Sequence, residues 1–315
     1  MTIRLDMLRA ASQARGLLGD SAACVIDYLR AQINPDGGFR GRSNHSDLYY
    51  TVFGTEALIA LGRPPEVGPL ASYLERFGDG SGLDFVHLAC LARSLADLSE
   101  IAAEPVEPGI RQAILRRTES HRSGDGGYNS STAAPQASAY PCFLALGVYQ
   151  DLDAEIPSPA ALAHSMMTLK TPQGGYANHP SIPVPATPAT AAAIATRHYL
   201  GLPIEHAAAD WLLGRVHRQG GFLPTSLTGD RAEPDLLSTA TAIHALALAA
   251  VPLDEIKASC LNFIHSLRTE QGGYCAGPAD KTCDCEYTYY ALLALGHLAG
   301  GSQDPENPPA PGEYR

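Results

Sequence analysis

The 315-residue sequence contains no apolar run that approaches the roughly 20 residues needed to cross a bilayer. Its first four residues lack the apolar core of a signal peptide. No cluster of Lys or Arg stands out and the formal net charge is -11, whereas phosphate binding needs a positive surface. These absences predict a soluble, cytoplasmic protein with no transmembrane segment and no nucleic-acid partner.

The sequence also lacks the signals of a disulfide framework and of β-sheet. Its seven cysteines are an odd number, which does not suit a fully paired framework. Four of them lie in apolar helical context, and we expect these to be small core residues: Cys24, Cys90, Cys142 and Cys260. No segment sustains a two-residue alternation of β-branched side chains. The chain, 45% hydrophobic and 17% charged, is therefore expected to be globular and all-α.

What the sequence does contain is a recurring pair of glycines followed by Phe or Tyr. The pairs begin at Gly37, Gly126, Gly174, Gly220 and Gly272, with spacings of 89, 48, 46 and 52 residues. Because 89 is close to two periods, a degenerate copy is expected in the gap, and the glycine-rich stretch 78–82 lies there. Six units of this length indicate stacked or closed supersecondary units.

Each unit predicts two helices, one before the glycines and one after the loop that follows them. The first set is expected at residues 21–31, 70–77, 108–120, 159–169, 204–218 and 253–267. The second set is expected at residues 47–61, 83–98, 137–149, 188–200, 234–250 and 284–299. Helices of the second set are apolar nearly all round, so they belong inside, while the first set carries the charges and belongs outside.

Six such pairs can close into a double ring, an (α/α)6 toroid that spans residues 1–300. The loops after the glycines would then gather at one mouth, although the spacing alone also allows an open solenoid. Residues 301–315 include four prolines and are expected to form an irregular or disordered tail.

The repeat resembles that of protein prenyltransferase β subunits. The shared pattern is Gly-Gly-Phe or Gly-Gly-Tyr, a loop with Pro, Asn or Arg, an Asp, and then Tyr-Thr or Tyr-Ser leading into an apolar helix. It covers residues 21–300, and type II terpene cyclases share the broader helical toroid. The resemblance implies an enzyme that binds an isoprenoid diphosphate in the central cavity and transfers or cyclises the prenyl chain. A protein prenyltransferase of this kind would also need a partner subunit.

The family's zinc ligands are an Asp and a Cys in the last repeat but one and a His in the last. In the fifth unit of this sequence Asp235 matches, but Leu237 stands where the Cys should be. In the sixth unit Tyr287 replaces the His. Because Leu cannot bind a metal, the triad in its usual place is incomplete. The Asp-x-Asp-Asp acid motif of terpene cyclases is missing as well.

Two shifted alignments keep other family residues. If the sixth unit is matched to the Asp-x-Cys repeat, Lys281, Asp284 and Tyr287 match, and Glu286 takes the place of the Cys. The resemblance then implies that Lys281 and Tyr287 contact the diphosphate. Asp284 and Tyr287 become candidate catalytic residues in this alignment.

In the other alignment, the first two units carry the site. Arg42 matches an arginine of the family's diphosphate loop, and Asp47 and His87 match the Asp and His ligands. Tyr49 then replaces the Cys. This alignment makes Asp47 and His87 candidate catalytic residues and Arg42 a substrate-binding residue. Neither alignment rebuilds the triad.

The densest group of possible metal ligands runs from residue 283 to residue 286, with Cys275 across a loop. Thiolate and carboxylate suit zinc, so we predict a metal held by Asp284 and Cys285, with Asp235 from the fifth unit, and magnesium as a possible alternative ion. The competing interpretation is that Asp235, Asp284, Asp47 and Asp84 cap the helices that they precede.

Aromatic residues of the inner helices could line the cavity, and Tyr50 and Tyr140 are predicted substrate contacts. The Ala-rich stretches 189–195 and 240–249 leave space for a prenyl chain, whose burial contributes ~0.8 kcal/mol per methylene. The alternative function is a non-catalytic toroid that binds a lipid-like ligand or a protein partner, which the incomplete triad favours.

Overall fold

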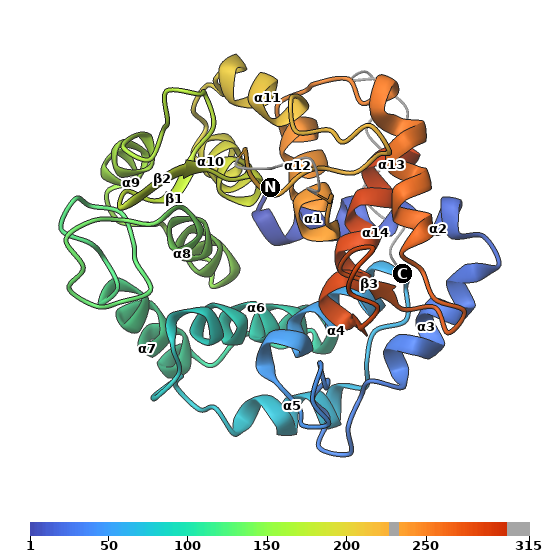
Figure 1. Ribbon diagram of the computed structural model, residues 1–315. Coiled ribbons are helices and arrows are strands. Elements are labelled where there is room, and N and C mark those ends of the chain that lie inside the picture. Colours follow the sequence, from blue (N-terminus) through green and yellow to red (C-terminus); the bar gives the residue numbers. More distant parts are fainter. Residues whose placement is uncertain (227–232, 301–315) are drawn as a thin grey trace.

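The computed structural model describes residues 1–226 and 233–300 (Figure 1). These residues form fourteen helices and two short two-stranded sheets. None of these helices is both long and apolar enough to span a bilayer. The tail expected at residues 301–315 lies outside the described residues.

Six helices form a closed inner ring. They are α4 (Leu48–Ala60), α6 (Phe85–Ala102), α8 (Ala139–Asp151), α10 (Thr187–Tyr199), α12 (Leu236–Leu248) and α14 (Cys285–Ala299). Each contacts the next, and α14 contacts α4, which closes the ring and excludes the open solenoid (Figure 1).

An outer helix precedes each member of the inner ring. These helices are α3 (Ser21–Arg30), α5 (Val67–Glu75), α7 (Pro108–Glu119), α9 (Pro159–Met167), α11 (His206–Leu213) and α13 (Asp254–Ser266). The predicted (α/α)6 toroid is confirmed. The fifth outer helix is shorter than the expected span of 204–218, because the chain turns at Gly214 toward the next double glycine.

The glycine turns are built around buried aromatic side chains. Gly37 has φ 88° and Gly272 has φ 97°, a region that an L-residue adopts only under strain. The aromatic residue that follows, such as Phe39 or Tyr274, is fully buried. Its backbone N–H donates to a threonine of the next inner helix, as Tyr274 does to Thr288 Oγ1 at 3.2 Å.

The same hydrogen bond recurs in other units and explains part of the repeat motif. The N–H groups of Phe39, Tyr176 and Phe222 donate to Thr51, Thr190 and Thr239 at 3.0, 2.9 and 2.9 Å. In the third unit the Cys142 thiol takes this place, at 3.3 Å from the Tyr128 nitrogen. The threonine of the repeat therefore has a structural role. Its hydroxyl accepts a hydrogen bond from the residue after the glycines and so holds the loop against the inner helix.

Of the four cysteines expected in the core, three are buried and one is not. Cys90, Cys142 and Cys260 are buried as predicted, but Cys24 is exposed, and the prediction for it was wrong. It lies near the N-terminus of α3, on the outer ring, where only Val25 and Leu29 face inward. An amphipathic outer helix has a solvent face, and apolar context in the sequence did not reveal which face carries Cys24.

Two N-terminal helices, α1 (Ile3–Ser12) and α2 (Ala14–Leu18), had no counterpart in the sequence interpretation. α1 contacts α14, α4 and α8 and lies within the outline of the ring (Figure 1). Its Ile3 N–H donates to Gln150 near the end of α8, and its Arg4 pairs with Asp97 near the end of α6. α1 therefore covers the end of the ring where the inner helices terminate.

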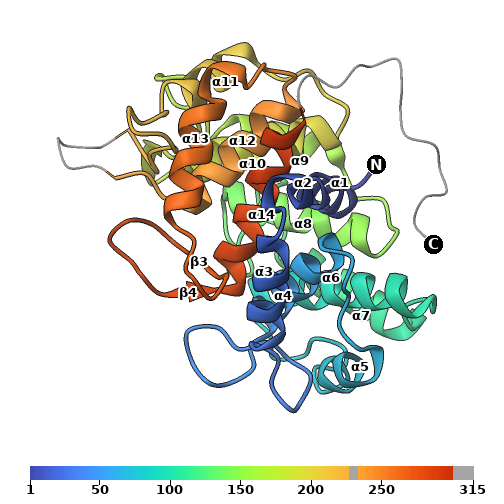
Figure 2. The same ribbon diagram turned by 90° about the vertical axis from the view of Figure 1, so that its right-hand side faces the viewer.

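The opposite end is the mouth, where the loops after the glycines lead into the inner helices. Asp47, Asp84, Asp235 and Asp284 all accept a backbone N–H of the helix that follows, so the predicted capping is confirmed for all four. Figure 2 shows α1 and the mouth loop of the sixth unit on opposite sides of the molecule. The mouth and α1 thus lie at opposite ends of the toroid.

Two mouth loops form antiparallel strand pairs that the sequence did not predict. β1 (Ala177–His179) pairs with β2 (Ile182–Pro185), and β3 (Tyr274–Cys275) pairs with β4 (Cys283–Asp284). Strands this short cannot show a two-residue alternation of side chains, so the sequence pattern did not predict them.

Gly296 of α14 lies against α1, and its replacement by alanine is expected to destabilise the protein. A Cβ atom there would overlap the backbone oxygen of Ala10. Backbone cannot move aside as a flexible side chain can, so we expect a loss of about 3 kcal/mol in the free energy of unfolding. Gly68→Ala in α5 is the matched control, because nothing lies within 4 Å of its Cβ position. Urea unfolding of both variants tests this, and equal midpoints would contradict the role given to α1.

Candidate functional site

A carboxyl group and a phenol meet where the ring closes. Glu286 lies in the first turn of α14 and Tyr49 in the first turn of α4, 237 positions away in the sequence. The Tyr49 hydroxyl donates to Glu286 Oε1 at 2.7 Å. Because α4 and α14 are the two helices that close the ring, this contact exists only in the closed toroid.

Glu286 is poised to exchange a proton near neutral pH. Burial raises the pKa of its carboxyl to about 7, and the neighbouring Asp284 also raises it. The hydrogen bond from Tyr49 and the charge of Arg42 act in the opposite direction. A carboxyl with such a pKa is protonated in a substantial fraction of molecules at pH 7, so it can serve as a general acid.

Aromatic rings surround this carboxyl. Tyr290 follows Glu286 by one helical turn, and Phe53 of α4 packs on Tyr49 with 4.9 Å between ring centroids and on Tyr290 with 5.4 Å. Their edge-on and tilted geometries are those favoured by aromatic pairs. The wall near Glu286 is therefore apolar and rich in π faces.

Tyr140, a predicted substrate contact, lies on the other side of the ring from Glu286. It lies on α8, which is opposite α14 in the ring, and keeps 39% of its surface accessible. Yet burial raises the pKa of its hydroxyl, and the nearby Cys90 thiol and Glu286 carboxyl raise it further. Tyr140 therefore keeps an accessible surface on the inner helix that lies across the ring from Glu286.

Arg42 is held by two carboxylates at the mouth. Its Nε donates to Asp284 Oδ2 at 3.0 Å, its Nη1 lies 2.8 Å from Asp280 Oδ2, and its guanidinium stands 5.6 Å from the ring centroid of Tyr287. Lys281 is exposed, and no carboxylate of the described residues pairs with it. Arg42 is therefore largely neutralised, whereas Lys281 and Arg40 of the mouth loops are not paired with a carboxylate in the described part of the chain.

The structure places Asp47 and His87, the candidate residues of the alignment on the first two units, close to each other. His87 Nδ1 lies 2.9 Å from Asp84 Oδ1, and His87 Nε2 lies 3.6 Å from Asp47 Oδ1. The imidazole thus stands between two carboxylates at the mouth. Tyr49, which takes the place of the family's Cys, turns instead to Glu286.

Tyr50 lies beside the Arg42 group. Its ring is in T-shaped contact with Tyr49 at 5.5 Å, and it fills the space next to Gly41, where a Cβ would overlap it. Burial raises the pKa of its hydroxyl, with contributions from Asp284 and Glu286. The predicted residues Arg42, Tyr50, Asp284 and Tyr287 therefore share one side of the mouth, and Tyr140 lies across the ring.

The three predicted metal ligands do not converge. Asp284 is engaged by Arg42 and by the Tyr287 N–H, and Asp235 by the N–H and hydroxyl of Ser238. Cys285 is fully buried, and burial raises the pKa of its thiol. Among residues 1–226 and 233–300, no three His, Cys, Asp or Glu side chains are placed to hold a metal ion. As placed here, Asp235, Asp284 and Cys285 therefore do not form a metal site.

The sequence interpretation did not select Glu286 as a functional residue. It placed Glu286 at the Cys position of the family motif and within the group of possible metal ligands at residues 283–286, but gave it no catalytic role. One signal could have identified it: a single carboxylate, one turn before Tyr290, at the start of a helix that is otherwise apolar. Such a residue faces the interior and must be neutral or paired there.

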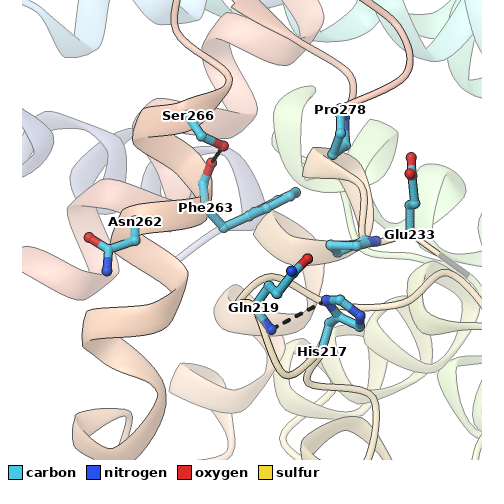
Figure 3. A pocket seen from close by; sticks show the side chains of 8 residues that line it. His217, Gln219, Glu233, Asn262, Phe263, Ser266 and Pro278 are labelled. Atoms are coloured by element: carbon cyan, nitrogen blue, oxygen red, sulfur yellow. Dashed lines mark hydrogen bonds between the residues drawn. The ribbon is translucent and has the colours of Figure 1, made fainter.

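A separate pocket of about 270 Å³ lies on the outer ring, and none of the predicted site residues lines it. It is formed by the fifth glycine turn, α13 and the loop before β4 (Figure 3). Its lining residues are His217, Gln219, Glu233, Pro234, Asn262, Phe263, Ser266 and Pro278. The candidate site is therefore the mouth and interior wall around Glu286.

The closed double ring of helices, with an acidic mouth and an aromatic interior wall, defines an α/α-toroid protein. The chain belongs to the prenyltransferase alpha-alpha toroid domain family, whose model matches residues 4–76 and 128–304. No curated protein matches the sequence.

Several solved structures share the fold. One is Candida albicans protein geranylgeranyltransferase-I complexed with GGPP, with 14% identity, coverage of 79% of this chain and 83% of that chain, and a TM-score of 0.60. Another is type II terpene cyclase MstE from Scytonema, with 14% identity, coverage of 90% and 98%, and a TM-score of 0.59. An inactive alpha-1,6-mannanase variant from Salegentibacter has 14% identity, coverage of 89% and 98%, and a TM-score of 0.55. At these identities the likeness shows the fold alone, and the fold serves different reactions.

Proposed function

We propose that this toroid is an enzyme that binds a prenyl chain inside the inner ring and cyclises it after protonation by Glu286. The observation that carries the proposal is the Glu286 carboxyl itself, hydrogen-bonded by Tyr49 and set in an aromatic wall, with its pKa raised to about 7. A weakly basic alkene needs a proton donor in a site that excludes water, and this wall offers one.

In the proposed cyclisation, side chains of this protein donate the proton and stabilise the carbocation. The Glu286 O–H bond breaks as a C–H bond forms on the alkene, which leaves a carbocation on the chain and a carboxylate on Glu286. A second alkene attacks the cation and closes the ring. The π faces of Phe53 and Tyr290 stabilise the positive charge. Loss of a proton from the cyclised cation completes an isomerisation and regenerates the carboxyl group.

Protonation is favoured over release of diphosphate because of the charges at the mouth. Arg42 is shared between Asp280 and Asp284, so only Lys281 and Arg40 of the cations named at the mouth are free for a diphosphate. Asp47 and Asp84 add further negative charge nearby. Diphosphate clamps depend on several free cations, so this mouth supports an uncharged or weakly charged prenyl substrate better. Transfer of a prenyl group from a diphosphate remains the less supported reaction.

A second candidate is a non-catalytic toroid that binds a lipid-like ligand. The observation in its favour is that neither family acid or metal motif is assembled: Leu237 replaces the Cys and Tyr287 the His of the zinc site. The interior wall would then hold a prenyl chain by burial alone.

The proposal is tested by incubating the purified protein with geranylgeraniol, geranylgeranyl diphosphate and a geranylgeranyl-substituted aromatic acid. We expect cyclised products with the mass of the substrate, detected by gas or liquid chromatography with mass spectrometry. Release of inorganic diphosphate without cyclisation would replace the proposal with prenyl transfer. A thermal shift with unchanged substrate would favour the non-catalytic candidate.

A further inference from the structure

Two thiols meet in the mouth loop of the sixth unit. Cys275 in β3 and Cys283 in β4 are directly opposite each other in the antiparallel pair, eight positions apart. Their Sγ atoms lie 2.9 Å apart. Opposite residues of antiparallel strands have Cβ atoms about 4.5–5.5 Å apart, and a disulfide needs about 3.5–4.5 Å, so a small shift suffices.

This pairing is specific among the seven cysteines, all of which lie in the described part of the chain. All seven are free thiols, and no other two of them are hydrogen-bonded to each other. Cys285 follows Cys283 by two residues but is fully buried in the core, and Cys24 is exposed on the outer ring. Cys283 is partly accessible, so a small oxidant can reach the pair.

We infer that Cys275 and Cys283 form a redox-modification site that a low-molecular-weight disulfide, such as oxidised glutathione, converts to an intramolecular disulfide. One thiolate attacks the glutathione disulfide, forms a mixed disulfide and releases one reduced glutathione. The second thiolate then displaces the other glutathione and forms the Cys275–Cys283 bond. The two protein thiols lose two electrons and two protons, and the glutathione disulfide takes them up to become two molecules of reduced glutathione.

The bond would fix one side of the mouth. The loop between the two cysteines carries Asp280, which pairs with Arg42, and Cys283 directly precedes Asp284, the other partner of Arg42. Cross-linking the base of this loop holds both carboxylates in place relative to α14. The inference does not rest on the proposed cyclisation, because it concerns only these thiols and the loop that they close.

Trypsin gives a direct test because Lys281 lies between the two cysteines. Cleavage after Arg268 and Lys281 places Cys275 in peptide 269–281 and Cys283 in peptide 282–315. After incubation of the full chain with oxidised glutathione at mildly alkaline pH, we expect non-reducing mass spectrometry to show the two peptides joined. Burial raises the pKa of Cys283 to about 12, so the exchange is expected to be slow and is followed over hours.

Cysteine variants show which two residues form the disulfide. Cys283→Ser is expected to abolish the cross-link, and Cys285→Ala to leave it in place. Cys24, exposed and without a partner thiol, is the internal control and should take up glutathione as a mixed disulfide. The oxidised wild type should also melt at a higher temperature than the reduced protein, and Cys283→Ser should not. Glutathione on Cys24 without any joined peptides, or joined peptides that persist in Cys283→Ser, would overturn the inference.

Discussion

Glu286→Gln is expected to lower the rate of prenyl cyclisation by about a hundredfold to ten-thousandfold, the range that a positioned general acid contributes. Glutamine keeps the size of the side chain and can still accept the hydrogen bond from Tyr49, which is 2.7 Å long in the structure. It has no acidic proton to give to an alkene. The rate is measured under saturating substrate, and the dissociation constant of the prenyl ligand is measured alongside.

Binding should be almost unchanged in this variant, because the aromatic wall stays in place. Tyr49→Phe is the matched control: it removes the hydrogen bond that lowers the pKa of Glu286 but keeps the proton donor. We expect it to retain most of the activity and to shift the pH profile upward. A Glu286→Gln variant with wild-type turnover would remove Glu286 from the mechanism.

The pH dependence follows from the same group. Glu286 acts in its protonated form, so activity should fall as the pH rises through about 7. Stability should fall between about pH 4 and about pH 7. The folded pKa lies above the unfolded value of about 4.3, so the folded state binds more protons between these values. The stabilising contribution is complete below about pH 4 and is lost as the pH rises through the folded value, by about 4 kcal/mol in total. Glu286→Gln should remove this dependence.

The fold could be predicted from the sequence because it depends on interactions between residues that are close together in the chain. The double glycines need their positive φ, the threonines bind the turn N–H groups, and the aspartates cap the inner helices. All of these act over a few residues, and their repetition reports the number of units. The same fact limits what the resemblance says about the reaction, because much of the shared motif forms turns and helix caps.

The site was predictable only in part, because its contacts depend on closure of the ring. Arg42 meets Asp284 across 242 positions, and no local signal links them. Asp47 and His87 came together as one alignment implied, since adjacent units lie side by side. The metal hypothesis grouped residues that are near in sequence, but consecutive residues at a helix start point in different directions. Cys285 accordingly faces the core, while Asp284 faces Arg42.

The helix that covers the closed end was not predicted, and it brings a buried charge network with it. Arg4 of α1 pairs with Asp97 at 3.0 Å and lies 3.7 Å from Asp151. Arg93 of α6 pairs with Asp151 at 3.0 Å and lies 3.6 Å from Glu56. Burial raises the pKa of Glu56 and of Asp97, and both Glu56 oxygens lack a hydrogen-bond partner in the described residues. Removing either arginine would leave buried carboxylates without a counter-charge and should lower the stability of the folded protein.

Arg93→Met should therefore lower the free energy of unfolding by about 3–5 kcal/mol, since it leaves buried carboxylates without their counter-charge. Arg76→Met is the matched control. Arg76 pairs with Asp36 at 2.7 Å, but its side chain is 60% exposed, so its loss should change stability by at most about 1 kcal/mol. Without Arg93 the pKa of Glu56 rises further, so the deficit should grow as the pH is raised, where the carboxylates are forced to ionise. Urea unfolding at acidic and alkaline pH measures both effects. A deficit equal to that of Arg76→Met, or one independent of pH, would mean that the ring closes without help from this ion pair and that packing alone holds α1, α4, α6 and α8 together.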